Sequence, residues 1–274
     1  MSDPVLENKL SALRKFFRLY GSAAIAFSGG VDSTFLLKVA HDELGEKVLA
    51  VSAVSILYPK RETEAAAAFC KEDGIRLVTI QIDPLKIHGF KNNPDNRCYI
   101  CKKEIFIKIR SLAFENGIYT VCDGSNADDT GDYRPGMKAL AELGIKSPLQ
   151  KSGFTKSEIR ELSKEIGLPS WNKPSTACLA SRFVYGEEIT AEKLQMVENA
   201  EDFLSELGFW QKRVRIHGDN LARIEVMPED FEKILNAKEK INNYFRSLGF
   251  KYVTLDIQGF RSGSMNEVIK NERS

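Results

Sequence analysis

The residues with the clearest chemical role lie in one glycine-rich segment, SGGVDST at 28–34. It follows the apolar run 23–27 and precedes the apolar run 35–40, an order typical of a strand, a tight turn and a helix. Adjacent glycines let the backbone approach a ligand closely, and a helix N-terminus directs N–H groups and a positive dipole end at an anion. The segment therefore predicts a phosphate-binding turn of backbone groups and hydroxyls: Ser28, Gly29, Gly30, Ser33 and Thr34.

Asp32 is the one carboxylate in this turn. A carboxylate next to phosphates is expected where Mg²⁺ lies between them. The turn lacks the lysine of a P-loop and the spaced glycines of a dinucleotide-binding loop, so both of those sites are excluded. Two interpretations stay open: a magnesium–ATP site, or an ordinary strand-to-helix turn in which Ser33 or Thr34 caps the helix.

Three of the five cysteines form a second candidate group, with Cys98 and Cys101 in a C-x-x-C and Cys178 far along the chain. Three thiolates without an obvious fourth ligand suit a [4Fe–4S] cluster with one open iron, which can bind substrate or an extra sulfide. Spacing alone leaves a cluster, a zinc site and unrelated thiols open. Cys70 and Cys122 fall in a helical and a strand pattern, so we expect them to be small buried hydrophobic residues.

Two further groups of polar residues could contact a ligand. The acids Asp128, Asp129 and Asp132 favour either a helix N-terminus or a magnesium site beside the phosphates. Later in the chain, alternation places Arg213 and Arg215 on the same face of a predicted strand. Arginines in that geometry either bind a phosphate or form ion pairs on an exposed sheet face.

The elements that must position these residues alternate between strands and helices in the first part of the chain. Such alternation predicts right-handed βαβ units and a doubly wound parallel sheet of the α/β class. Ligands of such sheets bind at the carboxyl ends of the strands, so we expect the 28–34 turn, the strand end at 52–55 and the 123–134 loop to share one crevice. The backbone near Val54 would hold the adenine of ATP there. The predicted helices span 4–20, 33–44, 60–73 and 100–115, and the predicted strands span 23–27, 48–54, 77–82 and 119–122.

The pattern changes after residue 171. An α-β-β-α-β order without regular alternation predicts a smaller α+β domain, which we assign to substrate binding or oligomerisation. We place the first domain at 1–183 and the second at 184–274. The predicted helices of the second domain span 191–208 and 229–247, and its strands span 213–217, 221–226 and 251–257, with a hairpin turn at 218–220.

Composition narrows the class of protein. The 274 residues carry 39 Lys and Arg against 38 Asp and Glu, a formal net charge of +1, which argues against a surface that binds nucleic acid throughout. The longest apolar runs fall well short of the ~20 residues of a membrane span. The N-terminal segment MSDPVLENKL lacks the apolar core of a signal peptide, and an odd number of cysteines does not suggest a disulfide framework. We therefore expect a cytoplasmic protein without a membrane or nucleic-acid partner.

Five segments together resemble the LarE family of PP-loop ATP pyrophosphatases, and they extend over nearly the whole chain. The resemblance implies a PP-loop fold and the use of ATP and Mg²⁺ to adenylate a carboxylate of pyridinium-3,5-biscarboxylic acid mononucleotide. Sulfur delivery then gives the thiocarboxylate precursor of the nickel-pincer cofactor of lactate racemase. It also implies a homo-oligomer, for which a hexamer is one possible form. The segments are SGGVDST, DGSNADDTGDYRPG at 123–136, WNKPSTACLASRF at 171–183, VRIH at 214–217 and LDIQGFRSG at 255–263.

The cysteines decide between two variants of this family. Some members take sulfur from a single cysteine of their own, and that position falls at Ala177, one residue before Cys178. The departure favours the other variant, in which three cysteines hold a [4Fe–4S] cluster that relays sulfide from a donor that the sequence does not specify. The resemblance implies these ligands and contacts: Cys98, Cys101 and Cys178 for the cluster, Arg213, Arg215 and Arg261 for the substrate phosphate, and Gly124, Ser181 and Arg182 elsewhere in the same site. For Mg²⁺, the carboxylates beside the phosphates suggest Asp32 and Asp128.

Three alternatives stay open at this point. A tRNA-thiolating enzyme of the same superfamily also combines this turn with three cysteines, although the balanced charge and the lack of a recognisable RNA-binding module argue against it. An ammonia-using amidating synthetase would need no cysteines. A nucleotide-sensing protein would bind ATP without releasing pyrophosphate.

Overall fold

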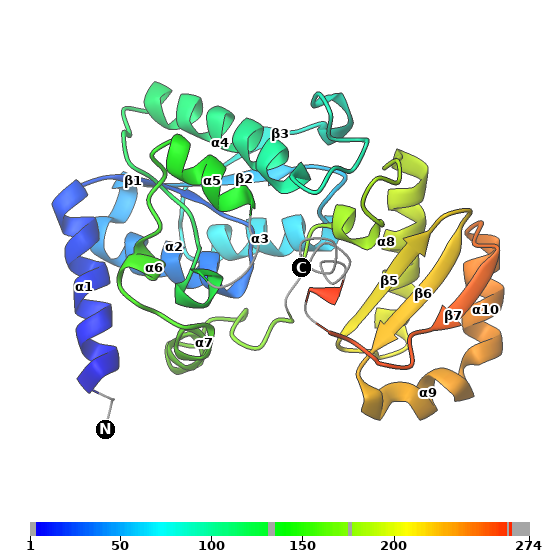
Figure 1. Ribbon diagram of the computed structural model, residues 1–274. Coiled ribbons are helices and arrows are strands. Elements are labelled where there is room, and N and C mark those ends of the chain that lie inside the picture. Colours follow the sequence, from blue (N-terminus) through cyan, green and yellow to red (C-terminus); the bar gives the residue numbers. More distant parts are fainter. Residues whose placement is uncertain (1–3, 131–134, 175–176, 262, 265–274) are drawn as a thin grey trace. The chain divides into compact units, whose positions relative to one another are not determined.

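The computed structural model describes residues 4–130, 135–174, 177–261 and 263–264 (Figure 1). The chain packs as two compact units. Unit 1 comprises Met1–Ile82 and Cys98–Ser175, and unit 2 comprises Asp83–Arg97 and Thr176–Ser274.

The loop Asp83–Arg97 packs within unit 2, although the segments on both sides of it belong to unit 1. The side-chain amide of Asn93 donates to the carbonyl of Val184 at 2.5 Å. The carbonyl of Asn93 accepts from the N–H of Gly186 at 2.9 Å. The predicted division of the chain at a single boundary, between residues 183 and 184, does not account for this loop. That boundary stays a prediction.

Unit 1 contains a parallel sheet with the strand order β3-β2-β1-β4. The chain moves outward from β1 to β3 and then returns to the other side of β1. Right-handed connections therefore put α2 and α3 on one face of the sheet and α4 on the other (Figure 1). This reversal beside β1 is a topological switch point, where open α/β sheets bind their ligands. The strands are β1 (Ala23–Ala26), β2 (Val48–Val54), β3 (Leu77–Gln81) and β4 (Val121–Cys122).

The four helices predicted at 4–20, 33–44, 60–73 and 100–115 are present, and three further helices follow them in the described part of unit 1. The helix predicted at 4–20 has those bounds, and the start of α4 lies three residues before the predicted one, so both cysteines of the C-x-x-C are helical. The helices are α1 (Pro4–Tyr20), α2 (Val31–Leu44), α3 (Lys60–Glu72), α4 (Arg97–Glu115), α5 (Pro135–Glu142), α6 (Pro148–Lys151) and α7 (Lys156–Glu165). Short 3₁₀ helices of unit 1 lie at Gly45–Lys47 and Ala127–Thr130, and another, Pro84–Lys86, lies in the Asp83–Arg97 loop of unit 2.

Helix α2 is enclosed by its neighbours, which fixes the turn that precedes it. Phe35, Leu36 and Leu37 are all buried, and α1 and α7 pack against the helix. Phe35 meets Phe154 edge-on, with 5.7 Å between the ring centroids. Because protein interiors are close-packed, the N-terminus of α2 and the start of α7 are held in a defined arrangement.

Unit 2 contains a three-stranded sheet with the order β5-β6-β7. Strands β5 and β6 form the predicted antiparallel hairpin, whose turn contains Asn220 at φ +63°, and β7 pairs parallel with β6. The helix predicted at 229–247 is divided at Ala237 into two helices. The elements are α8 (Ala191–Glu206), β5 (Lys212–His217), β6 (Leu221–Val226), α9 (Phe231–Asn236), α10 (Lys238–Ser247) and β7 (Tyr252–Leu255), with 3₁₀ helices at Leu179–Arg182 and Pro228–Asp230.

The observed architecture confirms the predicted fold class, a parallel α/β sheet followed by a smaller α+β segment. Among the described residues, no helix is both long enough and apolar enough to cross a membrane.

Candidate active site

The turn between β1 and α2 has the geometry of an anion cradle. Gly29 has φ +70°, and a Cβ placed on it would lie 3.0 Å from the Cβ of Ala66 on α3. The hydroxyls of Ser28 and Ser33 lie 3.1 Å apart, and the Ser33 hydroxyl donates to the carbonyl of Gly30 at 3.2 Å. These bonds fix the shape of the turn, and the first N–H groups of α2 are directed out of the helix end.

The loop after β4 lies against the same helix end. A Cβ on Gly124 would lie 3.1 Å from the backbone nitrogen of Ser33, so a larger residue would push the two backbones apart. Asp123 is buried, accepts from Ser147 Oγ at 2.5 Å and forms a shorter hydrogen bond with Ser125. The carboxyl ends of β1 and β4 are therefore brought together at the switch point.

Asp32 is the residue at this site whose hydrogen bonding is incomplete. Its Oδ2 accepts from Lys156 Nζ at 2.6 Å, while its Oδ1 is buried and has no hydrogen-bond partner among the described residues. A buried carboxylate oxygen without a partner costs about 1–3 kcal/mol. A divalent cation coordinated at Oδ1 would remove that cost, so this donor fits Mg²⁺.

The carboxylates of Asp128 and Asp129, in the loop after β4, differ from that of Asp32 because they accept hydrogen bonds from backbone N–H groups. The Oδ2 of Asp128 accepts from the N–H of Lys156 at 2.8 Å, so this carboxylate supports the start of α7. Asp129 accepts from the N–H of Asn126 at 3.0 Å. Neither bond is to the helix that follows this loop near residue 134, so both predicted roles, at that helix N-terminus and in a magnesium site with Asp128, stay predictions. Asp132 lies outside the described residues.

Sequence reasoning did not identify two lysines that contact the cradle. Lys156 pairs with Asp32, and Lys173 donates to the carbonyl of Gly29 at 3.1 Å and forms an ion pair with Glu62 of α3. Lys173 stands in the WNKPSTACLASRF motif, so its position in the sequence was a signal that could have been used.

Val54 is the last residue of β2, and its carbonyl accepts from the N–H of Ile82 at 2.9 Å. It therefore lies at a carboxyl strand end, as a backbone contact to adenine requires, and the contact itself stays a prediction.

The cysteines divide between the units. Cys98 and Cys101 lie three residues apart in the first two turns of α4, so both face the same side of the helix, with Cys98 exposed and Cys101 buried. Cys178 belongs to unit 2 and is half-buried. All five cysteines lie in the described part of the chain and none forms a disulfide there, so their sulfur atoms are open to the thiolate ligation that iron–sulfur clusters use. Within the described ranges, no three Cys, His, Asp or Glu side chains are grouped as a preformed metal site.

The two remaining cysteines are buried, as predicted. Cys70 is 1% exposed and Cys122 is fully buried. Burial raises the pKa of Cys70 to about 12, and it also raises the pKa of Cys122. Both therefore stay protonated thiols at neutral pH.

The predicted arginines form a buried, charged cluster in unit 2. Arg182 makes two 2.8 Å hydrogen bonds to Glu201, and Arg215 makes two 3.0 Å hydrogen bonds to Glu225. Arg213 differs, because no carboxylate pairs with it and its Nε has no hydrogen-bond partner in the described part of the chain. The buried cluster thus has three arginines but two glutamates, so one positive charge in it has no matching negative charge. The sequence analysis did not identify Glu201 or Glu225.

The electrostatics of Arg213 follow from this arrangement. Burial, and then the charges of Arg182 and Arg215, lower the pKa of Arg213 from its ordinary 12.5 to about 10. Its guanidinium lies over the ring of Phe260, 4.7 Å from the centroid. At neutral pH Arg213 is therefore a buried cation that an anion such as phosphate would stabilise.

Of the other residues predicted for this site, Ser181 contacts the buried arginines, whereas Arg261 contacts Asp256 and Gly259. The carbonyl of Ser181 accepts from Arg215 at 2.5 Å, and its hydroxyl lies 3.0 Å from Arg182 Nη1. Arg261 lies 3.8 Å from Asp256 and donates to the carbonyl of Gly259. The phosphate role of Arg213, Arg215 and Arg261 stays a prediction.

Replacing Arg213 with leucine should stabilise the ligand-free protein by about 1–3 kcal/mol, because it removes a buried charge that has no ionic partner among the described residues. The same change should abolish the increase in thermal stability that a phosphate-bearing substrate produces. Chemical unfolding with and without the substrate measures both effects. Arg215→Leu is the contrast, because it removes both 3.0 Å hydrogen bonds from Arg215 to the buried Glu225, leaves that carboxylate with Arg223 as its ionic partner, and should destabilise the protein by about 1–3 kcal/mol. A destabilised Arg213→Leu variant would contradict the assignment.

Replacing Gly29 with alanine should weaken ATP binding at least tenfold, because the new Cβ meets Ala66 and strains a left-handed residue of the cradle. Gly74 is the matched control, with φ +67° and no atom within 4 Å of the point where a Cβ would lie. Both variants should lose about 1 kcal/mol of stability from backbone strain, and only Gly29→Ala should lose ATP affinity, measured by calorimetric titration. Equal ATP affinities for the two variants would contradict the cradle.

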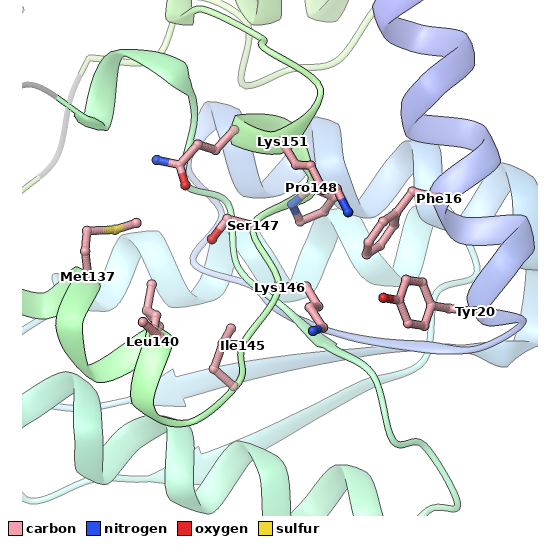
Figure 2. A pocket seen from close by; sticks show the side chains of 11 residues that line it. Phe16, Tyr20, Met137, Leu140, Ile145, Lys146, Ser147, Pro148 and Lys151 are labelled. Carbon is pink, nitrogen blue, oxygen red and sulfur yellow. The ribbon is translucent and has the colours of Figure 1, made fainter.

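A separate cavity of about 320 Å³ lies in unit 1 beside α1 and α5 (Figure 2). Phe16 and Tyr20 line one side, and Met137, Leu140 and Ile145 line the other. Ser147 also lines it, and through its bond to Asp123 the wall of the cavity connects to the loop beside the cradle.

A parallel sheet whose switch point carries a backbone anion cradle and a carboxylate with an unpartnered oxygen defines an ATP pyrophosphatase of the PP-loop class. The profile of the NAD synthase family matches residues 8–113, which contain β1, the cradle and most of α4. A protein named pyridinium-3,5-bisthiocarboxylic acid mononucleotide synthase, from Lactiplantibacillus plantarum, is 41% identical over 89% of each chain. A Synechocystis sp. protein is 45% identical over 97% of this chain and 99% of its own. A glutamine-hydrolysing GMP synthase protein from Thermoplasma volcanium is 29% identical over 74% of each chain.

The chain therefore belongs to the LarE family of ATP-using sulfurtransferases. This confirms the family, the fold class and the type of enzyme predicted from the sequence. Enzymes of this family act on a small-molecule substrate and use ATP with Mg²⁺.

Proposed function

We propose that this chain adenylates a carboxylate of pyridinium-3,5-biscarboxylic acid mononucleotide and then replaces the activated oxygen with sulfur. The product would be the thiocarboxylate precursor of the nickel-pincer cofactor. The observation that carries the proposal is the anion cradle, with Gly29 at φ +70° and Asp32 presenting an oxygen that has no partner among the described residues. The name of the 41% identical relative, a bisthiocarboxylic acid mononucleotide synthase, supports the choice of substrate.

Two displacements account for the need for ATP. Sulfide cannot displace a carboxylate oxygen directly, because hydroxide is a poor leaving group. The substrate carboxylate first attacks the α-phosphorus of ATP, and pyrophosphate leaves. Sulfide then attacks the carbonyl carbon, and AMP leaves. The N–H groups at the start of α2 would neutralise the departing pyrophosphate, mainly by fixed position and charge, and Asp32 would hold the Mg²⁺.

The substrate carries a phosphate, and unit 2 has a cation suited to it. Arg213 is buried without a carboxylate partner in the described part of the chain, while Arg182 and Arg215 are each paired with a glutamate. A phosphate would supply the missing negative charge and accept hydrogen bonds from the guanidinium. We therefore assign the phosphate of the mononucleotide to Arg213, with Arg215 and Arg261 as neighbours.

For the sulfur step we propose a [4Fe–4S] cluster held by Cys98, Cys101 and Cys178. When bound, such a cluster supplies an iron position that carries the incoming sulfide. The proposal is supported by three cysteines outside any disulfide in the described part of the chain, two of which share one face of α4 near its positive end. The homo-oligomer and the cytoplasmic location that the sequence predicts stay predictions.

The test uses the full-length protein purified without oxygen and incubated with ATP, Mg²⁺, sulfide and the dicarboxylic mononucleotide. We expect pyrophosphate release that depends on the mononucleotide, a thiocarboxylate by mass spectrometry, and bound iron with an absorption band near ~400 nm. An amide formed from ammonia would instead support an amidating synthetase. Tight, salt-sensitive binding of tRNA would support a tRNA-thiolating enzyme, and ATP binding without pyrophosphate release would support a nucleotide sensor.

A further inference from the structure

Arg97 is the residue at which the chain passes from unit 2 to unit 1. It ends the loop Asp83–Arg97 of unit 2 and is also the first residue of α4, so Cys98 follows it directly. Its side chain is buried, with 4% exposed. A cation at the first position of a helix is disfavoured by about 0.3–1 kcal/mol, because it lies at the positive end of the helix dipole. Other contacts must therefore hold this arginine in place.

Two neighbours in unit 2 hold the guanidinium of Arg97. It lies over the ring of Tyr185, 4.6 Å from the centroid, and its Nη1 donates to the side-chain oxygen of Asn93. Asn93 is fully buried and has φ +50°, a left-handed conformation that asparagine adopts more readily than most residues. Its side-chain amide donates to the carbonyl of Val184, and its own carbonyl accepts from the N–H of Gly186. We call Asn93, Arg97 and Tyr185 the clamp.

A short, ordered segment joins the clamp to Cys178. The buried side chain of Arg182 donates to the carbonyl of Cys178 at 3.3 Å. Phe183 is fully buried and forms a β-bridge with Ile216 of β5. Because both side chains are enclosed in unit 2, Cys178 and Tyr185 keep fixed positions relative to each other.

The geometry of α4 connects the clamp to both cysteines of the C-x-x-C. The Cα of Cys98 lies about 3.8 Å from that of Arg97, the length of one trans peptide step. Cys101 lies about one helical turn after Arg97, which corresponds to about 6 Å of helix rise. Both cysteines therefore lie within about one turn of a residue anchored in unit 2, although α4 from Cys98 onward packs in unit 1.

We propose that Arg97 is a positioning residue: with the other two residues of the clamp, it holds the C-x-x-C thiols at the segment that carries Cys178, so that all three cysteines can ligate one cluster. This inference rests on the proposed [4Fe–4S] cluster. Charge favours the same arrangement, because three thiolates give an oxidised cluster a net negative charge. A cation one residue from Cys98 would compensate that charge and favour the reduced state.

The first test uses the full-length protein without iron and dibromobimane, a short reagent that bridges two thiols. Peptide mapping by mass spectrometry gives the ratio of the Cys98-to-Cys178 crosslink to the Cys98-to-Cys101 crosslink, which lies within α4 and is the internal reference. We expect Arg97→Met to lower this ratio about tenfold, because loss of the clamp lowers the effective concentration of one thiol beside the other. Tyr185→Leu, which removes only the ring contact, should lower it about threefold. All variants are compared at a temperature at which circular dichroism shows them folded.

Lys91→Met is the matched control, because Lys91 belongs to the same loop and its 57% exposed side chain pairs with Glu188 at 3.6 Å. It should leave the crosslinking ratio unchanged. A wild-type ratio in Arg97→Met, or no Cys98-to-Cys178 crosslink in the wild-type protein, would overturn the inference.

The second test measures bound iron and the reduction potential in full-length protein purified without oxygen. Arg97→Met should lose most of its iron, and the cluster that remains should have a lower reduction potential than wild type in a titration followed by electron paramagnetic resonance. Arg97→Lys keeps the charge and should restore the wild-type potential, which a merely structural role of the arginine does not predict. If the wild-type protein formed the Cys98-to-Cys178 crosslink and bound no iron, the proposed cluster would fail while the positioning of the thiols would stand, which separates the two failures.

Discussion

Replacing Asp32 with asparagine should lower ATP-dependent pyrophosphate release by about 10²–10³-fold, equivalent to about 3–4 kcal/mol of transition-state stabilisation. Asparagine keeps the size of the side chain and removes its charge. The buried Oδ1, which has no partner among the described residues, would then no longer attract a divalent cation. The negative charge that develops on the departing pyrophosphate would lose the metal that compensates it.

The loss of the metal ion in Asp32→Asn should be measurable in ATP binding as well as in pyrophosphate release. Titration calorimetry should show ATP binding to Asp32→Asn that no longer depends on Mg²⁺. Asp42→Asn is the matched control, because Asp42 lies in the same helix, is 48% exposed and pairs with Lys38 on the surface. It should leave pyrophosphate release unchanged. Retention of magnesium-dependent release within tenfold of wild type in Asp32→Asn would argue against Asp32 as the metal ligand.

The position of the cradle could be predicted from the sequence because its causes are local. Ala23, Ala24 and Ile25 form an apolar run that only a central strand buries completely, and they are 0% exposed. Adjacent glycines and a following apolar helix then determine the turn. The alternation of strands and helices also limits the topology, so the switch point beside β1 follows from general rules of α/β sheets.

The environment of the arginines could not be predicted in the same way. Alternation correctly put Arg213 and Arg215 on one face of β5, but it could not indicate whether that face is covered. The register places Glu225 opposite Arg213, yet the carboxylate pairs with Arg215, which also contacts Ser264 near the end of the described chain. Which arginine is left without a carboxylate therefore depends on side-chain packing between segments that are distant in sequence.

Lys156 was missed for a related reason. Its partner Asp32 is 124 residues away, and no local pattern connects them. The available signal was physical rather than sequential: a lysine at the first position of a well-capped helix opposes the helix dipole and requires a compensating contact. Long-range pairs of this kind become visible only when α2 and α7 are seen packed together.

Replacing Cys98, Cys101 and Cys178 together with alanine should abolish thiocarboxylate formation while pyrophosphate release continues. The thiols are proposed to hold the sulfur-carrying cluster, whereas the cradle in unit 1 performs the activation. Iron content should fall from about four atoms per chain to none, and the visible absorption should disappear. Metal analysis, pyrophosphate release and mass spectrometry of the product on one sample test these effects together.

Cys70→Ala controls for the general loss of a thiol. Cys70 is 1% exposed, and burial raises its pKa to about 12, so it should lose about 1 kcal/mol of stability and keep both iron and product. Mass spectrometry of the protein after turnover separates the two family variants, because a sacrificed cysteine would lose sulfur and limit each chain to one turnover. Continued thiocarboxylate formation by the triple variant would show that the three cysteines do not carry the sulfur.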